Sequence, residues 1–290
     1  MSVFVRQNAI AMEYTKDAWA ILNPIEQSIK AKIEKYGTPL KDWDITINYG
    51  IKTGCNEAFI ISGEKRKELI TEDPKSDEII RPILRGRDIK RYGYEFADLW
   101  LINIECGFTN KYRGNKRPEE FIKTKYPAIY NHFMKVASAK TKGKGLINRD
   151  DKGDYWWELR SCAYTNDFSK QKIMYSEIVR RPQFYLDNEG KFFPEATTFI
   201  MVGVHLEYLQ ALLHSNLLTY AFKKFYAGGG LGEDGYRYKK AFLENLPIVV
   251  PSDEDEKTCI KFMQEPQNLE KFICHLYNLT EEEALFINSL

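Results

Sequence analysis

The residues that could carry catalysis form several partial motifs, but none has the complete spacing that its chemistry requires. The glycine cluster GGGLGEDG at 228–235 follows a helical pattern and lacks a Gly-Lys-Ser/Thr ending, so it predicts neither a dinucleotide loop nor a P-loop. The triplet Asp255-Glu256-Lys257 has the residue types of a metal-dependent nuclease, yet it opens a helix, where acids are favoured anyway. We interpret the glycine cluster as a hinge or contact loop and the triplet as part of a helix terminus.

Histidine, serine, cysteine and methyltransferase motifs are also missing from the sequence. The four histidines lie in helical patterns without HExxH spacing, and no Gly-x-Ser-x-Gly elbow occurs. The five cysteines are scattered and never form a CxxC pair, which argues against a zinc site or a disulfide framework. No Asn/Asp-Pro-Pro-aromatic motif is present to hold an exocyclic amine. The sequence therefore predicts no catalytic residue, metal site or cofactor site in this chain.

Basic, aromatic and amide side chains in loops remain, and they suit contacts with phosphate groups and base edges. In IIRPILRGRDIKRY at 79–92, several cations surround a glycine turn. The net charge is only +1, but basic residues gather at 81–91 and 111–152, whereas acids gather at 253–256 and 281–283. This distribution permits a basic face for DNA, although an ordinary solvated loop would have the same composition.

The surrounding pattern predicts a helix, then short strands, then helices again, which is an α+β chain. NPIEQSIKAKIEKYG at 23–37 has Asn23 as N-cap, Pro24 at the first helical position and Gly37 as a left-handed stop. Runs of β-branched and aromatic residues predict strands at ITINY, EAFIIS, LWLINI, KIMYSEI, PQFYLD and TTFIMV. Capping boxes at Ser252 and Thr280 start the final helices.

Turns and breaks between these elements are predicted from glycine and proline. PQFYLDNEGKFF at 182–193 is typical of a hairpin turning at 188–190, and GIKTGCN is expected to be a turn between two strands. The helix at 118–138 should break at Pro127, and one long amphipathic helix is expected at 205–226. No apolar run is long enough for a membrane span and no secretory signal is present, so we expect a cytoplasmic protein.

Five blocks of sequence occur in one order along the chain: GIKTGCNEAFII at 50–61, IIRPILRGRDIKRY at 79–92, WWELR at 156–160, IMYSEI with the later TTFIMV, and GEDGYRYKKAFLENLPI at 232–248. In this order they resemble the TaqI-like C-terminal specificity domain of type IIG restriction-modification enzymes. The resemblance spans roughly Trp19 to the C-terminus, and HLYNLTEEEALFI at 275–287 is similar to the usual end of those polypeptides. Several motifs in the correct order are more specific than any single one.

The resemblance implies a function and a division of the chain. In that family an endonuclease domain and an adenine-specific methyltransferase domain, which uses S-adenosylmethionine, precede the target recognition domain. By resemblance, residues 1–43 form a helical linker toward a missing methyltransferase domain, and 252–290 form a C-terminal helical tail. Residues 44–251 form the target recognition domain, with a mixed β-sheet and inserted helices. The chain would bind double-stranded DNA sequence-specifically, and S-adenosylmethionine and magnesium would belong to the missing catalytic domains, its expected partners.

Three alternatives stay open. The chain could be a fragment of a type I specificity subunit, although a complete subunit would show a second recognition domain that this sequence lacks. It could be a self-sufficient nuclease with an unfamiliar site, which would cut plasmid DNA with magnesium alone. It could also be a protein-protein scaffold, which would not retain duplex DNA at any salt concentration.

Candidate DNA contacts follow from side-chain chemistry within the resembling blocks. For the phosphate backbone we expect Lys52, Thr53, Arg85, Arg87, Lys90, Arg91, Lys140, Lys142 and Lys144. For bases, arginine suits guanine and glutamine suits adenine, which indicates Arg180, Arg181, Gln183 and Arg237. Structural alternatives compete: Tyr236 and Tyr238 beside Arg237 are typical of core packing, as are Trp156 and Trp157, and glycines such as Gly86 would only shape turns.

Overall fold

The computed structural model describes residues 22–138, 145–228 and 235–289, and these form two compact units. The sheet unit comprises 46–177 and 183–203, and the helical unit comprises the described residues up to Ile45, Ile178–Pro182 and those from Val204 onward. Helices and several small sheets occur together, which confirms the α+β expectation. None of the helices in these ranges is both long and apolar enough to cross a membrane.

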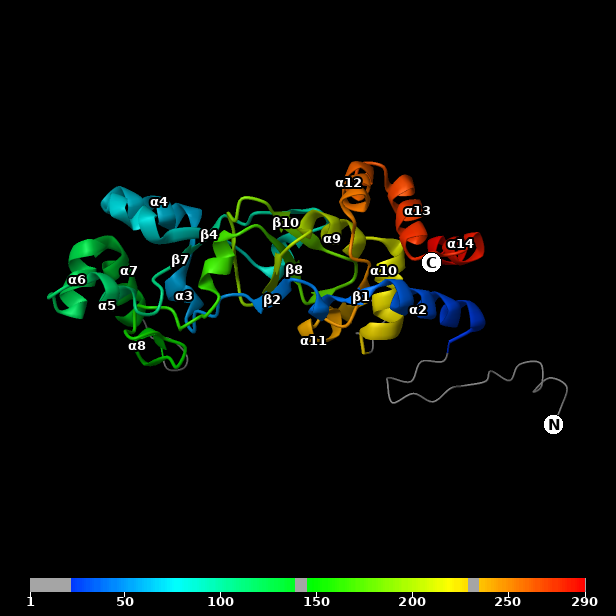
Figure 1. Ribbon diagram of the computed structural model, residues 1–290. Helices are drawn as coiled ribbons and strands as arrows, with labels where there is room; N and C mark the ends of the chain where they lie inside the picture. Colours follow the sequence, from blue (N-terminus) through cyan, green and yellow to red (C-terminus); the bar gives the residue numbers. More distant parts are fainter. Residues whose placement is uncertain (1–21, 139–144, 229–234, 290) are drawn as a thin grey trace, which may run out of the picture. The chain divides into compact units, whose positions relative to one another are not determined.

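The sheet unit is built on two four-stranded sheets (Figure 1). The first has the order β10 (Phe184–Asp187), β8 (Lys172–Ser176), β12 (Thr198–Gly203), β2 (Ile45–Tyr49). The second has the order β11 (Phe193–Pro194), β4 (Ile80–Leu84), β7 (Leu99–Ile102), β3 (Ile60–Ser62). The second sheet is mixed, because β11 runs parallel to β4 while the other described pairs are antiparallel.

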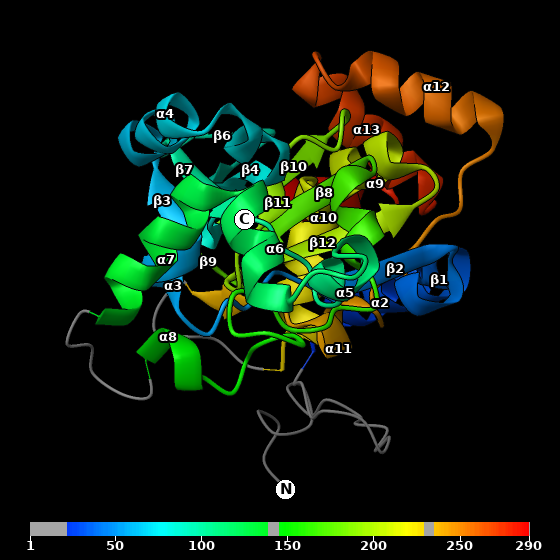
Figure 2. The same cartoon turned by 90° about the vertical axis from the view of Figure 1, so that its left-hand side faces the viewer.

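Six helices of the described chain are inserted between these strands in the sequence, and three of them pack at the second sheet. They are α3 (Asn56–Phe59), α4 (Gly63–Glu72), α5 (Phe108–Tyr112), α6 (Pro118–Lys125), α7 (Pro127–Ser138) and α8 (Gly145–Asn148). Figure 2 shows α3, α4 and α7 beside β3 and β7, and Phe59, Ile102 and Phe133 are fully buried in the shared core. The helix pair α6 and α7 confirms the break predicted at Pro127.

Shorter elements complete the sheet unit. They are the 3-10 turns η2 (Pro74–Ile79), η3 (Gly86–Asp88) and η4 (Thr165–Ser169), and the small ladder of β5 (Ile89–Lys90) with β6 (Gly93–Tyr94). The turn η3 begins at the second residue after β4 and leads into β5; it contains Arg87, and Arg85 is its N-cap.

Two expectations for the sheet unit are wrong. The start of EAFIIS is the helical turn α3, because one turn buries both Ala58 and Phe59, which a strand would point to opposite faces. The expected hairpin is absent from 182–193, since β10 pairs with β8 while β11 pairs with β4 in the other sheet. Asp187 redirects the chain: its carboxylate accepts the Lys191 and Phe192 amides at 3.0 and 2.8 Å and pairs with buried Lys172 at 2.6 Å.

The helical unit contains the N-terminal helix and most of the C-terminal part of the chain. Its helices are α2 (Pro24–Tyr36), α9 (Leu206–Leu213), α10 (Asn216–Ala221), the π-helical turn η5 (Phe222–Tyr226), α11 (Lys240–Leu243), α12 (Asp253–Phe262), α13 (Pro266–Leu276) and α14 (Glu281–Asn288). Two short ladders accompany them: β1 (Thr38–Pro39) with β14 (Pro247–Ile248), and β9 (Ile178–Val179) with β13 (Tyr236–Arg237), while η1 (Leu40–Asp42) follows β1.

Helix ends in this unit agree with the sequence in three places and differ in two. Ser252 and Thr280 form the predicted capping boxes, and Asn23 is the predicted N-cap, which also forms a capping box with Glu26. The long helix expected at 205–226 is interrupted, because the Ser215 hydroxyl accepts the Leu218 amide and caps a new helix. Gly37 is extended and not left-handed; it is needed because a Cβ there would lie 2.6 Å from the Pro247 carbonyl carbon.

Helices α2 and α14 are joined by one buried carboxylate. Glu283 receives the Lys32 ammonium and the Ser28 hydroxyl, each at 2.6 Å, and the Thr280 amide at 2.7 Å. The segments expected as an N-terminal linker and a C-terminal tail therefore touch within one unit. The functional division at 43/44 and 251/252 stays a prediction, whereas packing alone divides the described chain between residues 45 and 46 and around 178–203.

The Glu283 network should make stability depend on acid. Burial acts to raise the pKa of Glu283, but hydrogen bonds from Lys32, Ser28 and the Thr280 amide outweigh it and lower the pKa to about 2. Since an unperturbed glutamate carboxyl in the unfolded chain has a pKa near 4.5, this stabilisation is complete above that pH and is lost as the pH falls toward 2. We expect Glu283→Gln to lower the free energy of unfolding at pH 7 by up to about 3 kcal/mol, with the deficit shrinking toward pH 2. Urea denaturation from pH 7 to pH 2.5 measures this, with exposed Glu282→Gln as control; a deficit independent of pH would contradict it.

Candidate nucleic-acid interface

A buried arginine organises the loop between α8 and β8. Arg149 is 3% exposed, and its guanidinium donates to the carbonyl oxygens of Thr53 and Asp151 at 3.0 Å, of Leu146 at 2.8 Å and of Glu158 at 2.5 Å, as well as to that of Trp156. Burial lowers the pKa of Arg149 to about 10, so the group stays a cation at neutral pH. The bond to Thr53 ties this loop to the GIKTG segment that follows β2.

A buried carboxylate in the same loop accepts hydrogen bonds from backbone amides, whereas Arg149 donates to backbone carbonyls. Glu158 is fully buried and accepts the Thr109, Asp154, Gly107 and Tyr155 amides at 2.9, 3.0, 3.1 and 3.3 Å. It therefore attaches the loop to the start of α5. Its carboxylate also lies with the ligand atoms of Cys106 and Asp154 within 4.8 Å of one another, a grouping that could hold a metal ion. Because both Glu158 oxygens already have backbone partners, the grouping is explained without a metal.

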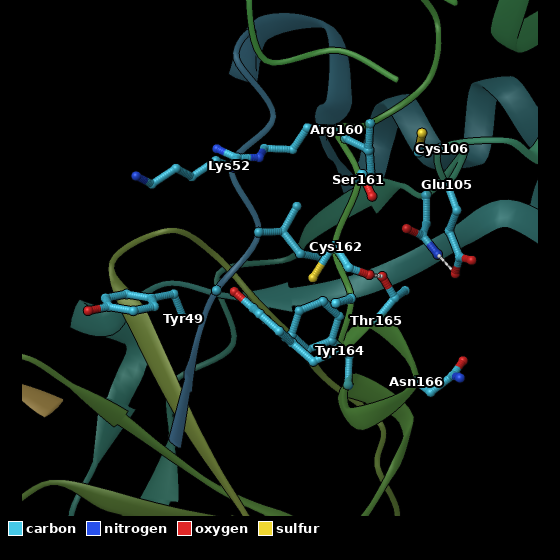
Figure 3. Close-up of a pocket in the computed structure, with 16 residues that line it drawn as sticks. Tyr49, Lys52, Glu105, Cys106, Arg160, Ser161, Cys162, Tyr164, Thr165 and Asn166 are labelled. Atoms are coloured by element: carbon cyan, nitrogen blue, oxygen red, sulfur yellow. Dashed lines mark hydrogen bonds between the residues drawn. The ribbon is translucent and has the colours of Figure 1, made fainter. Parts of the chain in front are cut away.

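These two charges position the walls of a cleft of about 480 Å³ in the sheet unit (Figure 3). Its lining comes from three segments: Tyr49–Lys52 after β2, the stretch containing Asn103, Glu105 and Cys106 after β7, and Leu159–Asn166 with Phe168 before β8. The three segments are strand ends, loops and the 3-10 turn η4, so the sheets form the frame and the connecting segments provide the side chains that line the cleft.

The rim of the cleft carries two cations. Lys52 and Arg160 are exposed, and Figure 3 shows their side chains extending on the same side of the cleft. Arg160 forms an ion pair with Asp151 at 3.0 Å, but both side chains are about half exposed, so the pair is weakly held and can exchange for a phosphate. Tyr49, 49% exposed, lies on the same segment as Lys52.

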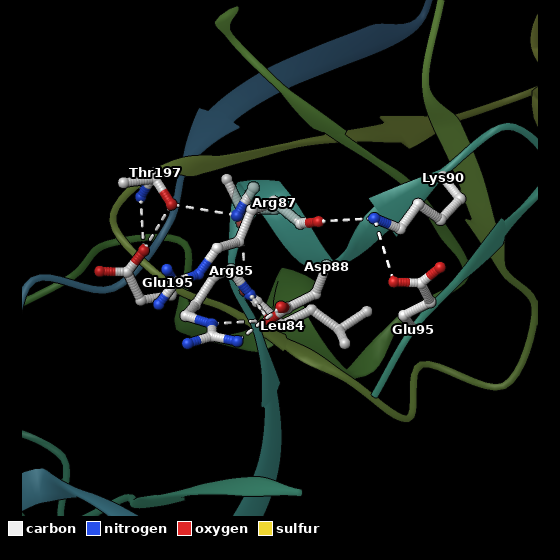
Figure 4. Close-up of polar contacts among 10 residues, drawn as sticks. Leu84, Arg85, Arg87, Asp88, Lys90, Glu95, Glu195 and Thr197 are labelled. Atoms are coloured by element: carbon white, nitrogen blue, oxygen red, sulfur yellow. Dashed lines mark hydrogen bonds and ion pairs between the residues drawn. The ribbon is translucent and has the colours of Figure 1, made fainter. Parts of the chain in front are cut away.

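The second cationic segment, Arg85–Arg91, is mostly engaged within the protein (Figure 4). Arg85 binds Asp88 through two nitrogens at 2.8 and 2.7 Å; burial acts to raise the pKa of Asp88, but the Arg85 contacts prevail and lower it. Lys90 pairs with exposed Glu95 at 3.2 Å, whereas Arg87 is exposed. Gly86 shapes this turn, since a Cβ there would lie 2.7 Å from the Thr197 carbonyl oxygen.

The structure separates the expected backbone contacts into exposed and engaged side chains. Lys52, Arg87 and Arg91 are exposed, and Arg91 lies over the Tyr92 ring at 5.5 Å. Thr53 is buried, with its hydroxyl donating to Asn56 at 2.6 Å, so the fold places it inside the protein and not on a DNA-facing surface. Arg85 is likewise committed to Asp88. Lys140, Lys142 and Lys144 lie outside the described residues.

The expected base-reading residues are divided between the two units. Arg180 and Arg181 are exposed in the helical unit, whereas Gln183 is partly buried in the sheet unit. Arg237 lies on β13 between buried Tyr236 and Tyr238, and its Nε atom is buried with no hydrogen-bond partner among the described residues. Core packing of these tyrosines and of Trp157 is thereby confirmed.

Arg160, Tyr49 and Tyr164 were missed as site residues. Two signals for them exist in the sequence: Arg160 ends the WWELR block, and Tyr49 directly precedes GIKTG. No spacing rule connects them, because Tyr49 lies more than a hundred positions from the other two, and the segments are brought together by tertiary bonds such as those of Arg149 to Thr53 and of Asn48 to Asp167.

Replacing Arg149 should destabilise the sheet unit and loosen the cleft. Arg149→Met leaves several buried carbonyls without a donor, so we expect the free energy of unfolding to fall by at least about 3 kcal/mol. Urea denaturation followed by tryptophan fluorescence measures the change. Arg160→Met, an exposed arginine eleven positions on, should shift stability by no more than about 0.5 kcal/mol. Equal effects of the two substitutions would show that Arg149 does not organise the loop.

The chain is similar in sequence to a curated methyltransferase and in fold to two solved restriction enzymes. The chain is similar to the type II methyltransferase M.MjaIV of Methanocaldococcus jannaschii, at 25% identity over 213 residues, which are 72% of this chain and 66% of that protein. Its fold is similar to that of the type IIL restriction-modification enzyme MmeI, solved in complex with DNA (TM-score 0.55, 13% identity, 87% of this chain and 37% of that chain). It is also similar to that of the type IIG restriction endonuclease BpuSI, with a TM-score of 0.56 and 14% identity; the match covers 91% of this chain and 32% of that chain.

The family is assigned from a sequence match that covers most of the sheet unit and extends into the helical unit. The family model of the TaqI-like C-terminal specificity domain matches residues 81–248, which include Arg87, Arg160 and Arg237. The match covers more than half of the 290 residues. This chain therefore belongs to the family of TaqI-like C-terminal specificity domains.

Proposed function

We propose that this chain is the sequence-specific, double-stranded DNA recognition module of a type IIG restriction enzyme and adenine-specific DNA methyltransferase. The observation that carries the proposal is the pair of exposed cations, Lys52 and Arg160, at one cleft of a chain that belongs to the specificity-domain family. Exposed cations on ordered loops neutralise phosphates and fix the register of a protein on DNA.

Base reading is assigned to side chains that can still reach a groove. Arg180 and Arg181 are exposed, and an arginine can bind the O6 and N7 atoms of guanine through two nitrogens. Gln183 and Arg237 are only partly exposed, so within this proposal they contribute after a change of rotamer or as supports for their neighbours. The exposed arginines of 85–91 add phosphate contacts.

Catalysis and its cofactors are assigned to other parts of the enzyme. The chain spans 66% of the length of M.MjaIV and about a third of MmeI and BpuSI, so those proteins contain segments that this chain does not match. We assign S-adenosylmethionine and magnesium, the methyltransferase and the endonuclease to such segments, with this chain and DNA as their partners in the cytoplasm.

DNA selection from a randomised duplex library tests the function directly. We expect one short motif to be enriched, and binding of unselected duplex to be weak, with a Kd of about 10⁻⁴ to 10⁻⁶ M at physiological salt. The absence of any enriched motif would refute sequence-specific recognition. Cutting of plasmid DNA by the chain with magnesium alone would instead support a self-sufficient nuclease.

The rim cations should set the salt dependence of binding. We expect Lys52→Gln with Arg160→Gln to weaken duplex binding about tenfold or more and to reduce the slope of log K against log salt by about 2, one unit for each lost phosphate contact. Fluorescence anisotropy between 50 and 200 mM salt measures both. Lys30→Gln removes a cation that pairs with Glu34 on α2 and serves as the control. An unchanged slope in the double variant would remove these residues from the interface.

A further inference from the structure

The cleft in the sheet unit is concave, and a protein does not need a concave site to read the bases of an intact duplex. Side chains that read base edges project outward into a groove, whereas this site is a hollow of about 480 Å³. That volume lies within the range of about 300–1,000 Å³ typical of small-molecule pockets. It suits a unit the size of one nucleotide and excludes a double helix.

Two aromatic rings of the cleft are supported from behind. Tyr164 packs edge-on against buried Phe168, with ring centroids 5.8 Å apart, and Tyr49 packs on Phe199 at 4.7 Å. The Thr165 hydroxyl donates to the Cys162 carbonyl at 2.9 Å and fixes the turn that carries Tyr164. Each ring is thus held in place by a phenylalanine. Both residues line the cleft, but in Figure 3 the Tyr49 ring points away from Tyr164, so Tyr164 is the ring that a base would meet. Preorganised aromatic faces of this kind are platforms on which nucleobases stack.

Polar and charged side chains of the cleft suit the other two parts of a nucleotide, which are the hydrogen-bonding edge of the base and the phosphate. Glu105 is exposed and accepts the Asn103 amide at 3.3 Å, which leaves carboxylate lone pairs for an incoming amine. In Figure 3 Glu105 and Asn166 lie on the other side of Tyr164 from Lys52 and Arg160. A base lying on Tyr164 therefore has hydrogen-bonding groups at one edge and cations on the side where its phosphate would lie.

We propose that this cleft binds one nucleotide swung out of a DNA duplex, with the base on Tyr164, its edge toward Glu105 and its phosphate near Lys52 and Arg160. A carboxylate only accepts hydrogen bonds, so the bases with an exocyclic amine, which are adenine, cytosine and guanine, fit better than thymine, which has none. The inference rests on the proposed DNA recognition. It adds that the module holds an unstacked base as well as reading paired ones.

The cost of unstacking gives a direct test, because that cost is smallest for a base that is already unpaired. Anisotropy of the full chain is measured with a perfect duplex and with the same duplex containing one bulged adenine or one bulged thymine. We expect the adenine bulge to bind about tenfold more tightly than the perfect duplex, and the thymine bulge to gain less. Glu105→Gln should reduce the difference between the two bulges, since an amide can also donate.

Variants of the ring separate stacking from folding. Tyr164→Leu should bring the ratio of bulged to perfect affinity to about one, and Tyr164→Phe should keep it. Tyr112→Leu replaces an exposed tyrosine of the sheet unit outside the cleft and should also keep it. Thermal unfolding shows whether Tyr164→Leu is folded; if it is not, the Glu105→Gln comparison of the two bulges decides.

Each result has one meaning. Equal affinity of wild-type protein for bulged and perfect duplex overturns the inference and leaves the proposed function standing. Failure to bind any duplex overturns both. Free deoxyadenosine monophosphate competing at the concentration of the bulged duplex would show a mononucleotide site that does not need DNA, and this too would overturn the inference.

Discussion

Two buried charges in one loop, the guanidinium of Arg149 and the carboxylate of Glu158, are the constraint on which the cleft depends. Moving either ion out of water costs several kcal/mol, and each regains that cost from backbone groups and not from an opposite charge. A carbonyl bound to Arg149 or an amide bound to Glu158 cannot move without leaving a buried group unpaired. These bonds therefore restrain the loop at several points along its backbone, although it has no ladder of its own.

These restraints explain why the surface around the cleft can present exposed cations at fixed positions. Lys52 follows β2, and Arg160 follows Glu158 by two residues, so both inherit their position from the Arg149 and Glu158 bonds. By contrast, Arg85 belongs to a sequence block with more positive charge than those of Lys52 and Arg160, but it serves the fold through Asp88. The density of charge in the sequence thus does not distinguish an exposed cation from one that is committed to the fold; the partner that the structure supplies does.

The helical unit is assembled from segments that are distant along the chain. Glu283 joins α2 to α14, and Glu26 accepts from Lys224 and Tyr220 at 2.9 Å, so α2 is held by the C-terminal half of the chain. A stripe of isoleucines on α2 required some partner for that helix, and Ile29 and Ile33 are indeed fully buried. The partner lies in the same polypeptide.

The sequence by itself determined the fold class, the family, the positions of most strands and the capped helix starts, because these depend on local periodicity and on side chains three residues from the groups they bind. It also located the cationic blocks. Only the tertiary structure decided that β10 and β11 enter different sheets, that Thr53 is buried, and that Arg160 joins Lys52 at one cleft. Each of these depends on a partner far away in the sequence, such as Lys172 for Asp187 or the Thr53 carbonyl for Arg149, and the identity of a distant partner is not encoded in local spacing.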